Sequence, residues 1–341
     1  MNTRAVETAY PTQSPDRGQG PGPSSADPVP GAGRRVLRGV ALAATVPYLT
    51  LKAAWLAGSR IGIPDGSVLL EPGLFFTVAN SVTLAMDACV IVLVLVLTRP
   101  WGVRVPGWLL TVPAFVATGL LTPILTGFPG QLLIRALGMG AAPAAARAVR
   151  EPFLDPWVFH VVYGGFTVQG LALAGLFVPY ARQRWGHRWQ GAPERRLPSS
   201  TGVVAGAAAT AGLVVGATYL YWACGGAAGL SALQRAERTA DGSVVSVVHA
   251  ACAIGAGAGA VLLARGRGRV RWSLALAWTG SAATFSWGCW LLIASLSGEF
   301  AGARGSTEVM YLTYAGQMII GLLAAAVLTR FLTARHADRP T

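Results

Sequence analysis

The chain has 341 residues, of which 53% are hydrophobic and only 12% are charged. One soluble core cannot bury so much apolar surface, which excludes an ordinary water-soluble domain and favours a protein whose solvent is the lipid bilayer. The formal net charge is +13, a value that in a soluble protein would favour binding to nucleic acid. The position of these charges relative to the apolar segments decides between the two interpretations.

The N-terminal residues 1–36 are predicted to be a disordered cytoplasmic tail. Residues 1–33 are rich in Pro, Gly and Ser and have no apolar periodicity, so they cannot bury enough surface to fold. Arg34 and Arg35 stand just before the first apolar run, as in a twin-arginine export signal, but a span flanked by cytoplasmic arginines has the same pattern. We interpret them as the flanking charges of a signal anchor.

Eight apolar runs of about 20 residues follow, the length that crosses a hydrocarbon core of roughly 30 Å. They predict an all-α fold, a polytopic bundle of eight transmembrane helices. The predicted spans are residues 37–57, 79–98, 107–127, 157–179, 200–222, 244–264, 271–295 and 309–331.

The arginines alternate from loop to loop between these spans. If the N-terminal tail is cytoplasmic, nineteen arginines fall on that side of the membrane and seven on the other. Because arginine-rich loops stay in the cytoplasm, this distribution predicts a multi-pass protein of the cell inner membrane with both termini cytoplasmic, the last tail being residues 332–341. It predicts the lipid bilayer as a partner and no nucleic acid. The oligomeric state is not encoded in any pattern of the sequence.

The two halves of the chain resemble each other, which predicts a parallel repeat of four plus four helices over residues 37–180 and 200–331. Three residues near 165 match three residues 151 positions later, and two earlier pairs match at differences of 167 and 166. The longer loop over residues 128–156 accounts for the change in spacing, and it forms either a short interfacial helix or a plain connection. The matching residues are Tyr163, Gly165 and Gly170 with Tyr314, Gly316 and Gly321, Trp55 with Trp222, and Arg99 with Arg265.

Small residues and cysteines inside the spans are interpreted as packing residues. Gly212 and Gly216, like Gly255 and Gly259, have the GxxxG spacing that lets helix backbones approach closely in lipid; Gly202 and Gly206 have it too. The four cysteines form no CxxC pair, so neither a disulfide framework nor a metal site is predicted. No cofactor is predicted.

Charged side chains within a bilayer are costly and usually mark functional sites, and two stand out here. Lys52 is the only lysine of the chain and lies roughly 8 Å inside the outer end of its helix, while Asp87 lies roughly 12 Å inside the outer end of the next. A lysine stem can span that difference. We therefore expect an ion pair between Lys52 and Asp87.

Further polar and aromatic side chains fall in the same outer half of the membrane domain. His160 and His249 are candidate catalytic partners of Asp87, although each histidine alone is also compatible with ordinary packing. A metal site is not favoured, because no helical pair of ligands has metal-binding spacing. If the deeper residues face inward, they line a substrate pocket together with Lys52: Tyr48, Tyr163, Trp287, Tyr314 and Gln317.

The segment PYLTLKAAWLAG, which begins at Pro47, lies in an arginine-rich and Ala/Gly-rich setting. It resembles uncharacterised multi-pass membrane proteins of high-GC actinobacteria. This resemblance covers about one helix and implies a host class and a compartment. It brings no catalytic residues.

Three functions are compatible with the sequence. In the first, a membrane-embedded enzyme acts on an isoprenoid or other lipid-soluble substrate, as a terpene cyclase does: Asp87 donates the initiating proton, His249 or His160 assists, and aromatic rings stabilise the carbocation. In the second, a secondary transporter exports a small organic compound and uses Asp87 with Lys52 for proton coupling or substrate binding. In the third, the protein is a membrane subunit without chemistry of its own.

Overall fold

The computed structural model of the protein describes residues 31–70, 73–139, 154–186, 197–236, 238–296 and 305–337. Within these ranges the chain is all-helical and contains no β-strand. Eight helices have 25 residues or more: α1 (Ala32–Leu56), α2 (Leu74–Thr98), α3 (Gly107–Ala136), α5 (Pro156–Trp185), α6 (Ser199–Ala223), α8 (Ala240–Ala264), α9 (Val270–Leu296) and α10 (Glu308–Ala337). Three short elements lie between them: η1 (Val68–Leu70), η2 (Pro100–Arg104) and α7 (Ala232–Ala236).

Each long helix coincides with one predicted apolar run, and seven of them are long and apolar enough to cross a membrane. These seven are α1, α2, α3, α5, α6, α8 and α10, so the chain has the helices of a multi-pass membrane protein. The segment predicted over 271–295 forms α9, which has 27 residues but is less apolar.

The helical ends differ from the predicted tails. Helix α1 already begins at Ala32, and Arg34 within it donates a hydrogen bond to the carbonyl oxygen of Leu97 in α2. Helix α10 continues to Ala337, through most of the predicted C-terminal tail. The remainder of the two predicted tails, residues 1–30 and 338–341, lies outside the described residues.

The predicted interfacial helix of the long loop is not separate where the structure describes it. Residues 131–136 are the last part of α3, which runs without interruption from Gly107 to Ala136. The rest of this candidate, residues 140–153, lies outside the described residues.

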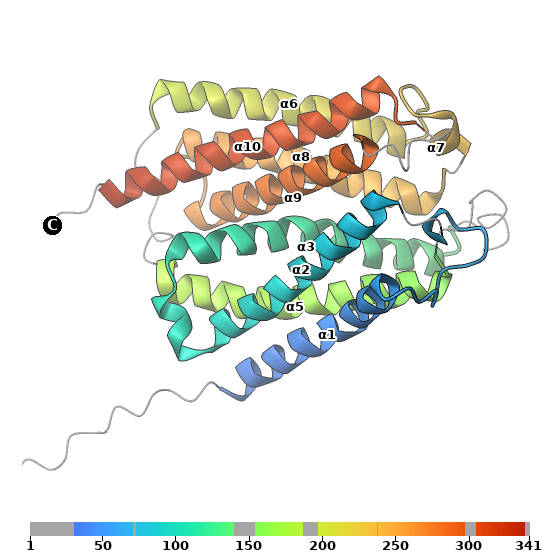
Figure 1. The fold of residues 1–341 in the computed structure, drawn as a ribbon. Helices are drawn as coiled ribbons and strands as arrows, with labels where there is room; N and C mark the ends of the chain where they lie inside the picture. Colours follow the sequence, from blue (N-terminus) through green and yellow to red (C-terminus); the bar gives the residue numbers. More distant parts are fainter. Residues whose placement is uncertain are drawn as a thin grey trace, which may run out of the picture.

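The long helices run roughly antiparallel and fall into two groups in Figure 1, α1, α2, α3 and α5 in one and α6, α8, α9 and α10 in the other. Helix α3 joins the groups, since it contacts both α8 and α9. The start of α1 and the end of α10 lie at the same end of the bundle (Figure 1).

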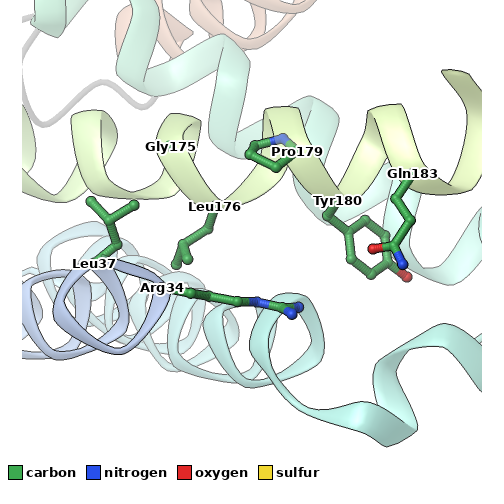
Figure 2. A pocket seen from close by; sticks show the side chains of 7 residues that line it. All are labelled: Arg34, Leu37, Gly175, Leu176, Pro179, Tyr180 and Gln183. Atoms are coloured by element: carbon green, nitrogen blue, oxygen red, sulfur yellow. The ribbon is translucent and has the colours of Figure 1, made fainter. Parts of the chain in front are cut away.

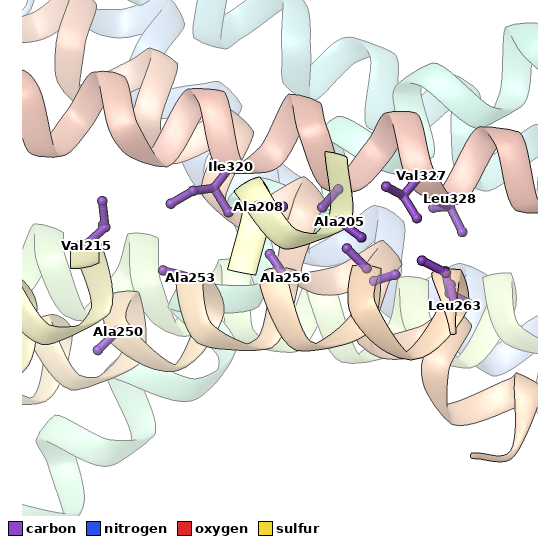
Figure 3. Packing of buried hydrophobic residues seen from close by; sticks show 14 of the residues in the cluster. Ala205, Ala208, Val215, Ala250, Ala253, Ala256, Leu263, Ile320, Val327 and Leu328 are labelled. Atoms are coloured by element: carbon purple, nitrogen blue, oxygen red, sulfur yellow. The ribbon is translucent and has the colours of Figure 1, made fainter. Parts of the chain in front are cut away.

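The second group is closely packed around alanine and glycine. Buried alanines of α6 and α8 lie against larger aliphatic side chains of α10, among them Ile320 and Val327 (Figure 3). A Cβ atom at Gly212 would lie 2.6 Å from the carbonyl oxygen of Ala253 in α8, and one at Gly259 would lie 2.5 Å from the backbone nitrogen of Ala277 in α9. These glycines permit the predicted close approach. Gly202 and Gly206 do not take part, because nothing lies within 4 Å of their Cβ positions.

The first group is less regular. Five prolines lie inside α1, α3 and α5, whereas α6, α8, α9 and α10 contain none. Each proline removes one backbone donor and interrupts the hydrogen-bond ladder, which membrane helices tolerate where neighbouring helices cover the freed carbonyl. The core of this group is built from aliphatic residues of α2 and α5, such as Leu97 and Leu173.

Polar contacts from the middle of α3 and from one of its ends hold the two groups together. The indole nitrogens of Trp278 and Trp287 in α9 donate to Thr118 Oγ1 and to the carbonyl oxygen of Leu120, both at 3.2 Å. Near the C-terminal end of α3, Arg135 forms an ion pair with Asp241 at the start of α8. This is the one ion pair within 4.0 Å in the part of the chain that the structure describes.

The loops after α1 and α6 have the same local geometry. The indole nitrogen of Trp55 donates to the carbonyl oxygen of Ile61 at 2.8 Å, and that of Trp222 donates to Ala228 at 2.9 Å, six residues ahead in both cases. A glycine with a left-handed φ angle follows in each loop, Gly62 at 73° and Gly229 at 80°. At the first, Gly62, an added Cβ would meet Val158 of α5; at the second, Gly229, it would meet Val309 of α10.

Candidate functional site

A buried polar cluster lies in the first group of helices, and we call it the acidic cluster: Lys52 of α1, Asn80 and Asp87 of α2, and Gln169 of α5. The side chain of Asp87 is 6% exposed and that of Gln169 is 1% exposed. The amide of Gln169 is the hydrogen-bonding neighbour of the Asp87 carboxyl group. Lys52 donates from Nζ to Asn80 Oδ1 at 2.5 Å. Three helices thus contribute charged or amide groups to one buried region.

Aromatic rings cover the lysine side of the acidic cluster. The Nζ atom of Lys52 lies 5.1 Å from the ring centroids of both Tyr48 and Trp55, a distance at which the ring faces attract a cation. Phe166 of α5 packs edge-on against Tyr48, with ring centroids 4.8 Å apart. Of the aromatic residues predicted to line a pocket with Lys52, Tyr48 lies beside it, and Trp55 joins it as a residue that was not predicted for the pocket.

The predicted direct ion pair between Lys52 and Asp87 is not formed. No nitrogen-oxygen contact within 4.0 Å joins them, although the two charges are close enough to interact electrostatically. The physical reason is that Asn80, about two helical turns before Asp87 on the same face of α2, supplies an oxygen to the ammonium group, while Gln169 faces the carboxyl group. Each charge has a neutral amide as its nearest polar neighbour.

A second buried polar cluster lies in the other group of helices, and we call it the neutral cluster: Tyr219 of α6, His249 of α8, Trp287 of α9, and Tyr314 and Gln317 of α10. The Tyr219 hydroxyl donates to Gln317 Oε1 at 2.9 Å, and Gln317 Nε2 lies 3.1 Å from His249 Nδ1. Since an amide nitrogen only donates, Nδ1 accepts, which places the ring proton of a neutral His249 on Nε2.

Ring contacts complete the neutral cluster. The His249 ring stacks on Tyr219 with centroids 5.1 Å apart, and Trp287 meets it edge-on at 5.6 Å. Tyr314 is 8% exposed and Gln317 is fully buried. Every hydrogen-bonding contact described here joins uncharged groups, so the cluster stabilises the packing of four helices.

Replacing Tyr219 with phenylalanine will destabilise the protein. The substitution leaves the buried Gln317 oxygen without its donor, at a cost of about 1–3 kcal/mol. Unfolding of the purified protein in detergent micelles measures the change, with Tyr221→Phe as the matched control because Tyr221 is on the same helix and 49% exposed. Equal stability of the two variants would contradict the role given to the Tyr219 hydroxyl.

His160 lies apart from Asp87, and Tyr163 lies beside the acidic cluster, close enough to Tyr48 to interact with it electrostatically. His160 is exposed, and its Nδ1 atom contacts the carbonyl oxygen of Pro156 within its own helix at 2.7 Å. Tyr163 stacks between Phe128 and Phe159, with centroids 5.9 and 6.3 Å away. His160 therefore has the contacts of a residue at a helix end, and nothing joins it to Asp87.

The structure thus divides the single pocket expected from the sequence. Asp87 and Lys52 lie in the acidic cluster with Tyr48 beside them, whereas His249, Trp287, Tyr314 and Gln317 lie in the neutral cluster. No hydrogen bond or ring contact among the described residues connects Asp87 with His249. The candidate acid and half of the candidate aromatic wall, Trp287 and Tyr314, belong to different groups of helices.

Two residues of the acidic cluster escaped selection from the sequence. Asn80 lies near the predicted end of its span, and Gln169 lies nearer the cytoplasmic side than Asp87 when depth is counted along each helix separately. Both side chains are uncharged, so placing them in the bilayer costs less free energy than placing a charge there, and neither stands out in the sequence. A signal existed in Gln169, since an amide deep inside an apolar helix needs a hydrogen-bonding partner.

Two cavities of the described structure lie elsewhere. One, of about 210 Å³, lies between the start of α1 and the end of α5, where Arg34, Tyr180 and Gln183 provide its polar groups (Figure 2). The Tyr180 hydroxyl already donates to Gly102. The other, of about 230 Å³, lies between α3, α8 and α9 and is lined by Thr122, Cys252 and mainly apolar residues. Neither contains a residue of the acidic cluster.

No family model matches the chain, and no curated protein or solved structure matches it significantly. Within the described residues, no group of three or more His, Cys, Asp or Glu side chains is placed to hold a metal ion. The acidic cluster brings the charged groups of Lys52 and Asp87 close enough to interact electrostatically between apolar helices.

Proposed function

We propose that the protein is a secondary transporter that exports a small organic compound, with the acidic cluster as its ion- or substrate-binding site. The observation that carries this proposal is the Asp87 carboxyl group, buried between apolar helices with one oxygen lacking any hydrogen-bond donor. A buried carboxyl group without a full set of partners is expensive, and in membrane proteins such groups serve ion or substrate pathways.

We further propose that the chain crosses the membrane eight times as two repeats of four helices. The matching loops at Trp55 and Trp222 support a repeat, as does the shared contact of Gly62 with Val158 and of Gly229 with Val309. The same five pairs of neighbouring helices also occur in both halves. Parallel repeats of this kind are known in transporters, where substrates bind between or within the repeats.

The two clusters fit this repeat at one position, because Lys52 of the acidic cluster and Tyr219 of the neutral cluster are equivalent at the difference of 167 residues. Asp87 and Gln169 have apolar counterparts, Ala253 and Ile320, at the differences of 166 and 151. The first repeat thus carries charged groups where the second carries uncharged ones. This asymmetry suits a transporter in which one half binds and the other half provides a rigid frame.

Reporter fusions test the proposed topology. If α9 spans the membrane and both termini are cytoplasmic, a reporter active only outside the cytoplasm will be inactive when fused at residue 267 and active when fused at residue 305. Fusions at the two termini will both be inactive, because an even number of spans returns the chain to its starting side. Equal activity at 267 and 305 would remove α9 from the set of spanning helices.

A membrane-embedded enzyme acting on an isoprenoid or another lipid-soluble substrate is the second candidate. The rings of Tyr48 and Phe166 near Asp87 favour it, since aromatic faces stabilise a developing carbocation. It is the weaker proposal, because the other predicted wall residues, Trp287 and Tyr314, belong to the neutral cluster.

Comparative mass spectrometry of cells with and without the gene separates the two candidates. A transporter predicts that deletion leaves a finished compound inside the cells and lowers its amount in the medium. An enzyme predicts instead that an unconverted precursor accumulates and that the product disappears from cells and medium alike. Unchanged profiles in both fractions would contradict both proposals and favour a membrane subunit without chemistry.

A further inference from the structure

Two buried acceptor oxygens meet in the acidic cluster without a donor. Oδ2 of Asp87 on α2 and Oε1 of Gln169 on α5 have no hydrogen-bond partner among the described residues. The two side chains are neighbours, since the Gln169 amide interacts with the Asp87 carboxyl group. Buried acceptors that lack a donor are costly, and a shared deficiency of two neighbouring side chains indicates that a single species is missing.

The protein itself offers no donor to these oxygens. The Lys52 ammonium group is engaged by Asn80 and by the rings of Tyr48 and Trp55. Two tyrosine hydroxyls also lie near the cluster: that of Tyr48, which interacts electrostatically with Asp87, is hydrogen-bonded to Thr83, and the ring of Tyr163 on α5 contacts two phenylalanine rings. The missing species therefore has to come from outside the protein.

The ligand has to be small and has to bring a donor. A hard metal cation is not favoured, because it takes about six oxygen ligands and the site offers few, with the Lys52 charge close by. A water molecule and a proton both bring a donor, but only the proton also removes the buried negative charge, because the neutral carboxylic acid gains an O–H group. That group can donate from Asp87 Oδ2 to Gln169 Oε1, so one proton satisfies both oxygens.

We propose that Asp87 and Gln169 form a proton-binding site, in which the neutral Asp87 carboxylic acid donates a hydrogen bond to the Gln169 side-chain oxygen. The proton comes from water and returns to water, and no other bond is made or broken. When the proton leaves, the negative charge on Asp87 attracts the Lys52 ammonium group, which then contacts Asp87 and releases Asn80. Protonation of Asp87 on α2 is thereby coupled to the position of the Lys52 side chain on α1. This role for the proton as coupling ion rests on the proposed transport function.

Infrared difference spectroscopy of the full-length protein in lipid vesicles tests the site without any substrate. At neutral pH the wild-type protein is expected to show the carbonyl absorption of a buried, protonated carboxylic acid, and exchange into heavy water should lower its frequency. The absorption should be lost in Asp87→Asn and retained in Asp65→Asn, whose side chain is exposed in the loop after α1.

The Gln169→Leu variant tests the hydrogen bond to the amide. Its carboxylic acid absorption should move to higher frequency, because the acid O–H loses its acceptor. A wild-type spectrum without such an absorption at neutral or acidic pH would overturn the site, and an unmoved absorption in Gln169→Leu would overturn the pairing. If the absorption behaves as expected while no compound is exported, the proton site stands and the transport function fails.

Discussion

Replacing Gly259 with leucine will destabilise the protein by about 3 kcal/mol or more. Helices α8 and α9 cross so closely at this point that a Cβ atom would lie 2.5 Å from the backbone nitrogen of Ala277. A leucine side chain therefore forces the two backbones apart, and the strain of overpacking a rigid core is typically about 1–3 kcal/mol and larger where backbone must move. Loss of this contact also loosens α8, the helix that carries His249.

Gly206→Leu is the matched control for Gly259→Leu. Gly206 is also an interior helix glycine of the second group, but it is exposed and nothing lies within 4 Å of its Cβ position. Leucine there removes a poor helix former without a clash, so stability should stay the same or rise by about 0.5–1 kcal/mol. Unfolding in detergent micelles measures both variants. A similar loss in the two would show that the α8–α9 contact is looser than the structure describes.

Replacing Asp87 with asparagine will abolish export. Asparagine has the same shape and can still contact Gln169, but it neither binds a proton nor attracts Lys52 as a carboxylate does. We expect the amount of compound released by cells to fall about tenfold or more, to the level of cells that lack the gene, which corresponds to a lost interaction of about 1.4 kcal/mol or more.

Two further variants make the Asp87→Asn result specific. Asp65→Asn removes an exposed carboxylate and should leave export unchanged. Asp87→Glu keeps the carboxyl group but displaces it, so export should be reduced and not abolished. Full export by Asp87→Asn, at a normal amount of protein in the membrane, would exclude the acidic cluster from transport.

The helices were predictable because crossing a bilayer demands long apolar runs, and each predicted run became a helix. Composition alone does not place α9 among the membrane-spanning helices. This helix contacts α3, α8 and α10, and it buries hydroxyl groups at Ser281 and Thr284. A helix that is surrounded by protein needs less hydropathy than one that faces lipid, so composition alone underestimates it.

The site was only half predictable, for a geometric reason. Counting residues from the end of a span gives the depth of a side chain, and Asp87 and His249 are at similar depth on that count. Depth says nothing about which helices are neighbours in the plane of the membrane, and the structure places these two residues in separate groups. Gln169 shows the opposite error. Counted from the end of its span it has a different depth from Asp87, yet the packing of α5 against α2 places its amide beside the Asp87 carboxyl group.

Transport by the purified protein tests the central claim most directly. The protein is incorporated into lipid vesicles that are loaded with the compound whose distribution the gene changes, and the outer solution is followed by mass spectrometry. Wild-type vesicles should release the compound chemically unchanged, and Asp87→Asn vesicles should retain it as protein-free vesicles do. Release of a chemically altered compound, or equal retention by wild-type and protein-free vesicles, would contradict the assignment as a transporter.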